Sequence, residues 1–268
     1  MIELFPFTKS VLIVGHPVHA VQIYGWLEII KPATMHALTD GSRPSGGTRL
    51  EPVIELMDQM NVQRGAVYGR YTDRDIYAAI LRRDYGFFIS LTEEITAELI
   101  RKKTQFVFGD AAEYYNPVHD VCRMIIGAAV EIANKSEGLQ IQNYDFLLMA
   151  PHTNHAESPG RKFFSRTLSD VQLEEKFSFA RRTYPEFADE TRRLFEGKPV
   201  ESYRTESLRP CGNRSGYDKL ADVKPFYEKY GEGQVAKGFY KRVLRFEEDM
   251  APLGEALWDF VEKTKVPS

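Results

Sequence analysis

The sequence predicts an α/β fold, in which a Rossmann-like, mostly parallel sheet is flanked by helices and followed by a helical C-terminal extension. Short apolar runs alternate with helix-compatible segments between residues 10 and 151, which is typical of parallel strands joined by right-handed crossovers. From residue 168 the chain becomes charged and helical instead. We therefore expect an α/β core over residues 1–160 and a helix-rich extension over residues 161–268, packed on that core.

Four apolar runs are predicted to form the strands of the core. The run "SVLIVGH" is nearly continuous in apolar residues until Gly-His ends it, and such a run suits a strand that is buried on both faces. The four predicted strands span residues 10–16, 33–41, 104–110 and 144–151.

Four helices are predicted between and after these strands. They span residues 20–30, 48–62, 91–103 and 118–136. In the second, apolar residues from Leu50 to Met60 recur every three or four positions, and Pro52 suits a first helical turn. For the third, Thr92 or Ser90 is the expected N-terminal cap.

The remaining stretches have weaker patterns. Residues 65–90 suggest a short strand, a short helix and a loop. In the second part of the chain, residues 168–197 are charged and helical, and residues 199–216 are rich in turn formers. Residues 237–263 are largely helical, with an interruption expected near Pro252.

Composition and charge exclude several classes of protein. With 35 basic and 38 acidic residues mixed along the chain, the net charge is −3 and no basic stripe for nucleic acid is present. Cys122 and Cys211 form no CxxC pair, so neither a disulfide framework nor a cysteine zinc site is expected. We predict no signal peptide and, since no apolar run reaches about 18 residues, no membrane span. A cytoplasmic protein that binds a small molecule is the expectation.

Polar side chains gather at the predicted carboxyl ends of the strands. His16, Asp40, residues 110–120 and His152 all follow or end a predicted strand. Ligands of open α/β sheets bind in the crevice outside these strand ends. The placement of these residues, rather than any one of them, predicts a functional site there.

Three histidines are candidate metal ligands. His16 and His19 stand in "GHPVH", and His119 stands in "NPVHD". Catalytic zinc usually has three protein ligands and one open position, which this trio would satisfy. The alternative is that all three are surface or capping residues. His36 lies inside a predicted strand and is expected in the core instead.

Four stretches of the sequence resemble one known family. "VLIVGHPVH", "LTDG", "TRLEPVIELMDQMNV" and "FVFGDAAEYYNPVHDVC" are similar to motifs of the LmbE-like (PIG-L) de-N-acetylase superfamily, and the resemblance covers residues 8–150. It implies a Rossmann-like fold and zinc-dependent removal of acetyl groups from amino sugars and related conjugates. The chain resembles a divergent member, because Arg49 and Glu51 stand two apart where the family places Arg and Glu three apart.

The resemblance also implies a ligand set. His16 falls on the first zinc ligand of the family's His-Pro-Asp-Asp motif, and His19 falls on its second aspartate, another ligand. His119 falls on the final histidine of the His-x-Asp-His motif, the third ligand. Neutral imidazole is a good zinc ligand, so zinc or another divalent metal is the implied cofactor, at a site whose net charge is one unit higher than in the family.

Three positions depart from the family's catalytic pattern. Val18 stands where the family has its general base, and Asn116 and Val118 stand where the second motif has its first histidine and its aspartate. Asn116 can donate a hydrogen bond to an oxyanion but cannot act as an acid. Loss of a general base typically removes a factor of about 10²–10⁴ in rate, so hydrolysis requires a replacement carboxylate.

Other residues near these motifs are assigned by their position. Glu113, Asp110 and Asp120 are candidates for the replacement base, and Asp120 is also a candidate to orient a metal ligand from behind. For catalysis we select Asn116, Asp120 and Glu113.

A second group is predicted to bind substrate. It consists of Asp40, Arg49, Tyr115 and His152. Aromatic rings such as Tyr115 stack on sugar faces, and an arginine such as Arg49 suits an anionic group. His152 forms a second HxxH pair with His155, for which a place in the pocket or on the surface is favoured over a metal-binding role.

Two functions remain open at this point. One is a metal-dependent amide hydrolase that acts on an N-acylated sugar or sugar conjugate through an altered site. The other is a member of the same family that binds a metal or a sugar without hydrolysis, which the valine at position 18 motivates. Different chemistry in the same pocket, with the metal as Lewis acid, is a third possibility.

Overall fold

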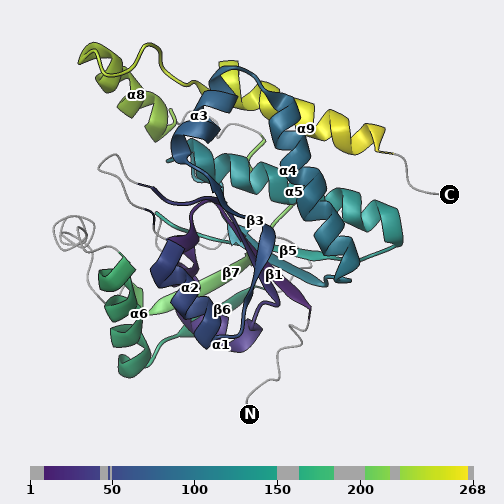
Figure 1. Cartoon of the computed structure of the whole chain (residues 1–268), viewed down its shortest axis with the longest axis vertical. Helices are drawn as coiled ribbons and strands as arrows, with labels where there is room; N and C mark the ends of the chain where they lie inside the picture. The colour runs from purple at the N-terminus through teal and green to yellow at the C-terminus, as the bar shows by residue number, and fades with distance from the viewer. Residues whose placement is uncertain are drawn as a thin grey trace.

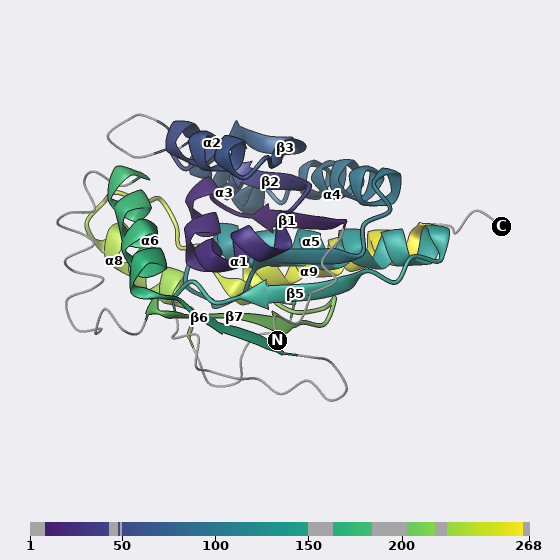
Figure 2. The same ribbon diagram turned by 90° about the horizontal axis from the view of Figure 1, so that it is seen from below.

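A mostly parallel sheet forms the centre of the computed structural model, which describes residues 9–42, 48, 50–149, 163–183, 203–217 and 224–264. Its strands are β1 (Ser10–Val14), β2 (Thr34–Thr39), β3 (Gln63–Tyr71), β4 (Phe106–Asp110), β5 (Gln142–Phe146), β6 (Phe164–Thr167) and β7 (Thr205–Pro210). Within the described residues the strand order is β3-β2-β1-β4-β5-β7-β6, and Figure 2 shows strands along this order from β3 to β6. The first five are parallel, and β7 pairs antiparallel with both β5 and β6. The predicted fold class is confirmed.

Helices cover both faces of the sheet. One face is covered by α3 (Asp73–Leu81), α4 (Tyr85–Arg101), α5 (Pro117–Glu137) and α9 (Ala251–Lys263). The other is covered by the 3₁₀ helix η1 (Pro17–Ile23), α1 (Tyr24–Ile30), α2 (Leu50–Gln59) and α6 (Asp170–Thr183). In Figure 1 the two groups lie on opposite sides of the strands.

The buried side chains of β1 show why both faces need a cover. Val11 and Ile13 belong to the core under α4 and α5, whereas Leu12 and Val14 belong to the core under α1 and α2. Successive side chains of a strand point to opposite faces, so a continuous apolar run requires a hydrophobic layer on each side. Burial of each such side chain contributes about 1.5–3 kcal/mol to stability. His36 of β2 is also fully buried, as predicted.

The helix over 91–103 begins earlier than the sequence analysis expected. It is the second half of α4, which starts at Tyr85, and the carboxylate of Asp84 caps it by accepting from the Phe87 N–H at 3.3 Å. The expected cap, Thr92, lies inside the helix and donates its hydroxyl to the Phe88 carbonyl at 2.9 Å. A threonine can bond to the carbonyl four residues earlier without ending a helix, so its cap preference was misleading here.

The second part of the chain adds strands as well as helices. Strand β7 lies within residues 199–216, which were expected to be only rich in turns, and β6 precedes α6. Helix α8 (Phe226–Ala236) and a π-helical turn, η3 (Phe246–Met250), lead into α9. Pro252 stands in the first turn of α9, where the π-helical turn η3 gives way to the α-helix, so a change in helical geometry lies next to the predicted interruption. The division into two parts at residues 160 and 161 stays a prediction.

No described helix is both long and apolar enough to cross a membrane.

One close contact joins α5 to the second part of the chain. A methyl group at Gly127 of α5 would overlap the backbone carbonyl oxygen of Asn213. Asn213 is held there on two sides, because its Nδ2 donates to Glu131 at 2.9 Å and its Oδ1 accepts from Asn143 at 3.0 Å. The loop after β7 therefore packs on α5 only because position 127 carries no side chain.

We expect Gly127→Ala to lower the free energy of unfolding by about 1–3 kcal/mol, because it overpacks this contact. The control is Gly233→Ala in α8, where a methyl group would meet nothing within 4 Å and alanine should add up to about 1 kcal/mol through helix propensity. Urea denaturation of both variants measures the difference. Equal stabilisation by the two substitutions would show that the contact is not rigid.

Candidate metal centre

The three candidate histidines meet where the connections from two neighbouring strands diverge. β1 and β4 are adjacent and parallel, but β1 leads into η1 on one face of the sheet and β4 leads toward α5 on the other. Such a switch point leaves a crevice at the carboxyl ends of the strands. His16 follows β1, His19 lies in η1, and His119 lies in the first turn of α5.

The two Pro-Val-His runs begin helices in the same way. Pro17 is the first residue of η1 and Pro117 is the first residue of α5, a position that the fixed φ of proline favours. In each run the histidine is the third helical residue. The backbone N–H of His19 donates to the residue before its proline, and that of His119 does the same, both at 3.1 Å. The same local arrangement thus places a histidine in the first turn of the helix that follows β1 and in the first turn of the helix that follows β4.

The three imidazoles lie close together and are buried. His16, His19 and His119 each offer a ring nitrogen, and these nitrogens lie within 4.8 Å of one another. The ring centroids are 4.5–5.1 Å apart. The exposed fractions are 6%, 8% and 6% in that order. The structure therefore brings together the three residues predicted as metal ligands.

Two carboxylates lie within hydrogen-bond distance of two of these histidines. His16 Nε2 lies 2.9 and 3.0 Å from the two carboxylate oxygens of Asp73. His19 Nδ1 lies 2.8 Å from Asp110 Oδ2, which also accepts from the Gly15 N–H at 2.7 Å. A carboxylate accepts hydrogen bonds, so each imidazole presents its N–H to the acid and its other nitrogen, a lone pair, elsewhere. This is the pairing that orients histidines in metal sites.

The two remaining nitrogens face each other, and this arrangement fits a metal. His16 Nδ1 and His19 Nε2 are 3.1 Å apart. With both N–H groups directed at carboxylates, two lone pairs meet across this distance, which is unfavourable unless a cation lies beside them. Two imidazole nitrogens bound to one zinc at 2.0–2.1 Å in tetrahedral geometry would lie about 3.3 Å apart. The donor types, and the spacing of His16 Nδ1 and His19 Nε2, therefore suit zinc or a similar divalent ion.

His119 is in the form that a ligand requires. Its Nδ1 is buried and has no hydrogen-bond partner within the described part of the chain. Burial, together with the neighbouring His19 and His16, lowers the pKa of His119 well below its usual value. A neutral imidazole is the metal-binding form.

Opposing effects act on the pKa values of the two carboxylates. Burial raises the pKa of Asp110 to about 6, although the hydrogen bond from the Gly15 N–H acts to lower it. Burial also acts to raise the pKa of Asp73, but the hydrogen bond from His16 opposes it, and the net shift is downward. Both acids are anionic at neutral pH, as partners of metal-binding histidines should be.

The residues selected for catalysis lie in and after the loop between β4 and α5. Asn116 caps α5, and its Oδ1 accepts from the Val118 N–H at 2.9 Å and from the Tyr77 hydroxyl at 3.3 Å. Asp120 is fully buried, and its Oδ1 accepts from the backbone N–H groups of Glu113 and Tyr114, both at 3.2 Å. Burial raises the pKa of Asp120 to about 7.

Glu113 links this loop to the chain after β5. Its carboxylate accepts from the backbone N–H of Leu148 at 2.6 Å and from that of Met149 at 3.0 Å. Glu113 and Asp120 thus hold the loop through backbone contacts, and their selection for catalysis stays a prediction. Val18 and Val118 are both buried, in the cores on opposite faces of the sheet.

The residues selected for substrate binding are only partly described. Asp40 directly follows β2, and its Oδ1 accepts from the Ser42 N–H at 2.8 Å. The ring of Tyr115 stacks on Phe226, with centroids 4.5 Å apart. Arg49, His152 and His155 lie outside the described residues.

Sequence reasoning missed Asp73. It is the first residue of α3, and only Thr72 separates it from the end of β3. Its position after a strand was the available signal, but residues 65–90 gave no clear strand end. β3 is an edge strand with mostly exposed or half-buried side chains, so it lacks the apolar pattern that identified the other strands.

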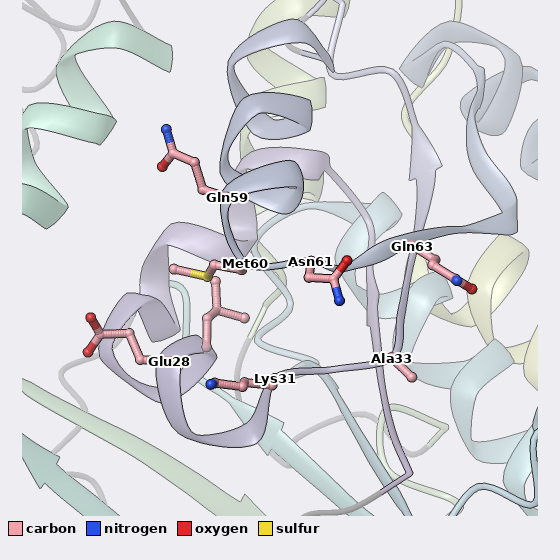
Figure 3. A pocket seen from close by; sticks show the side chains of 8 residues that line it. Glu28, Lys31, Ala33, Gln59, Met60, Asn61 and Gln63 are labelled. Atoms are coloured by element: carbon pink, nitrogen blue, oxygen red, sulfur yellow. The ribbon is translucent and has the colours of Figure 1, made fainter.

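A hollow of about 820 Å³ lies at the opposite end of the strands, beside the amino ends of β2 and β3. Figure 3 shows its lining side chains, which come from the ends of α1 and α2 and the starts of β2 and β3. They are Leu27, Glu28, Lys31, Ala33, Gln59, Met60, Asn61 and Gln63. None is a histidine or cysteine, and the two charged side chains among them, Glu28 and Lys31, form no catalytic arrangement, so the site is sought at the histidines.

Comparison with solved structures identifies proteins that share this fold. The A40926 pseudoaglycone deacetylase Dbv21 aligns with a TM-score of 0.51 and 15% identity, over 76% of this chain and 96% of that chain. A deacetylase triple mutant (Orf2*T) of the teicoplanin biosynthetic pathway aligns with a TM-score of 0.52 and 15% identity, over 76% and 97%. No protein-family model and no curated protein sequence matches the chain. At these identities the likeness establishes the fold.

We expect Asp110→Asn to lower the free energy of unfolding of the metal-free protein by about 1–3 kcal/mol. An amide at this position either turns an N–H toward the donors of Gly15 and His19 or buries it without an acceptor, and buried unsatisfied donors cost that much. The control, Asp259→Asn on the exposed face of α9, should change stability by less than about 0.5 kcal/mol. Urea denaturation at pH 7.5 compares them, and an unchanged Asp110→Asn variant would contradict the role of this carboxylate.

Proposed function

We propose that this protein is a metal-dependent amide hydrolase of the LmbE type, which removes the acyl group from an N-acylated sugar or sugar conjugate. The observation that carries the proposal is the buried group of His16, His19 and His119 at the switch point of the sheet. The fold that the chain shares with the A40926 pseudoaglycone deacetylase and with the deacetylase of the teicoplanin biosynthetic pathway supports it. The substrate would be a small molecule or glycoconjugate.

The three histidines would hold the metal, and zinc is the leading candidate. When bound at three imidazoles with one open position, zinc supplies a water of lowered pKa and polarises a carbonyl oxygen. His16 and His19 would be oriented for this by Asp73 and Asp110 through their N–H groups. His119 needs no proton removed before it binds, since burial keeps it neutral.

The remaining roles are assigned to the loop between β4 and α5. We assign the amide group of Asn116 to the acyl oxygen, because it can donate a hydrogen bond as charge develops there. Proton transfer is assigned to Asp120 or Glu113, the carboxylates that hold this loop. Tyr115 would stack on the sugar ring, and Asp40, Arg49 and His152 would contact its polar groups.

A non-hydrolytic relative is the second candidate. The observation in its favour is that Val18 and Val118, which occupy the positions of two family aspartates, are buried among apolar side chains on opposite faces of the sheet. A valine cannot transfer a proton. Under this alternative the protein binds a metal and a sugar conjugate but releases no acid.

We expect the purified protein to bind about one equivalent of zinc and to release acetate from an N-acetylated amino sugar conjugate. Removal of the metal with a chelator should abolish the release, and added zinc should restore it. His119→Ala should weaken zinc binding, measured by calorimetry, whereas the surface control Asp259→Ala should leave both affinity and activity unchanged.

The two candidates give different results in this experiment. Zinc binding without acetate release from any substrate in a panel of N-acetyl amino sugars supports the non-hydrolytic alternative. Full activity in protein shown by elemental analysis to be free of metal would refute metal dependence altogether.

A further inference from the structure

Helix α3 contacts both segments that carry the candidate ligands. Asp73 is its first residue and contacts His16, and Tyr77, one turn later, donates its hydroxyl to Asn116 at 3.3 Å. Residues four apart lie on the same face of a helix. Asn116 caps α5, the helix that bears His119. One face of α3 thus links the segment after β1 to the segment after β4.

The first turn of α3 is fixed independently of these contacts. Thr72 and Asp75 form a capping box, in which the Asp75 N–H donates to the Thr72 hydroxyl at 3.2 Å and the Thr72 N–H donates to the Asp75 carboxylate at 2.9 Å. A capping box satisfies two of the N–H groups that a helix start leaves unpaired. Asp73 lies between these two residues, so its backbone is held in place before it meets His16.

We propose that Asp73 is a positioning residue, which holds His16 as the Nε2–H tautomer so that Nδ1 is presented to the metal. The inference rests on the proposed metal site. Both oxygens of Asp73 lie within 3.0 Å of His16 Nε2, so either oxygen can accept a hydrogen bond from an Nε2–H group. His16 Nδ1 is then left on the side of His19, 3.1 Å from its Nε2.

Charge balance favours the same role. Three neutral imidazoles around a divalent ion leave a charge of +2 in a buried site, which is unfavourable unless anions lie nearby. Asp110 supplies one negative charge behind His19, and Asp73 supplies the second behind His16. The Asp73 side chain is 33% exposed, so this carboxylate lies on the solvent side of the three histidines.

The test compares Asp73→Ala, Asp73→Asn and the control Asp259→Ala, which also removes one carboxylate but at an exposed position on α9. In metal-free protein, ¹⁵N NMR of the histidine rings reports which nitrogen carries the proton. We expect the Nε2–H form of His16 in the wild type and the control, and a shift toward the Nδ1–H form in Asp73→Ala. Asp73→Asn keeps an oxygen acceptor and should retain most of the wild-type tautomer.

Zinc affinity gives the second measurement. We expect Asp73→Ala to bind zinc about 10–100-fold more weakly than the wild type, the usual effect of losing a residue that orients a metal ligand, with Asp73→Asn in between. Substituting Co²⁺ allows the ligand field of the site to be followed by its visible spectrum. If Asp73→Ala does not fold, Asp73→Asn carries the test, since its loss of charge alone should weaken binding.

The outcomes separate this inference from the proposed function. A wild-type protein that binds no zinc would overturn the proposed metal site. A wild type that binds zinc, with Asp73→Ala and Asp73→Asn equal to it in affinity and in His16 tautomer, would overturn only the role of Asp73. A tautomer change in Asp73→Ala together with weaker zinc binding supports the inference.

Discussion

The carboxylate of Asp110 joins the end of β4 to the turn after β1, and the geometry of the site depends on this contact. One oxygen accepts from both the Gly15 N–H and His19 Nδ1. Gly15 can approach so closely because it carries no side chain: a methyl group there would lie 3.1 Å from the same oxygen and 3.2 Å from Val118. A buried acid with these donors fixes where η1 begins, and hence where His16 and His19 lie relative to α5.

Electrostatics then explains why buried histidines and buried acids are found together. Each of two imidazoles directs its N–H to an acid, and the nitrogens that face each other are acceptors. In a low-dielectric interior, a network of polar side chains destabilises the protein when some of its donors or acceptors lack partners. The same network stabilises the protein when all of them are paired. A bound divalent cation would complete it, since two carboxylates balance its charge. The same physics that destabilises the metal-free arrangement thus favours metal binding.

The likeness to solved deacetylases and the departures from the family motifs concern different parts of the molecule. The shared fold would suit many chemistries, because function is decided by the side chains at a site rather than by the fold. In the resemblance to the LmbE-like family, Val18 and Val118 stand where the motifs have aspartates, and both side chains belong to the cores of the sheet. The three candidate histidines therefore lie together, whereas these two positions offer no group that could transfer a proton.

Local signals in the sequence determined most of the sheet and identified the three candidate ligands. β1, β2 and β4 are found where the apolar runs predicted them, because strands that are buried on both faces must be apolar throughout. β5 (Gln142–Phe146) overlaps the strand predicted over 144–151 only at residues 144–146, because it begins with the polar residues Gln142 and Asn143, which carry no apolar signal. The Pro-Val-His runs likewise specify their own helix starts.

Only the tertiary structure decided the end of the edge strand, the pairing of the last two strands and the contacts between carboxylates and histidines. The edge strand β3 is partly exposed, so no apolar pattern marks where it ends. The position of Asp73 after this strand could therefore not be predicted. The short strands β6 and β7 form by pairing with each other and with β5, and the carboxylates meet their histidines across 57 and 91 residues of chain. Contacts between residues so far apart depend on how the strands are ordered, which no local stretch of sequence specifies.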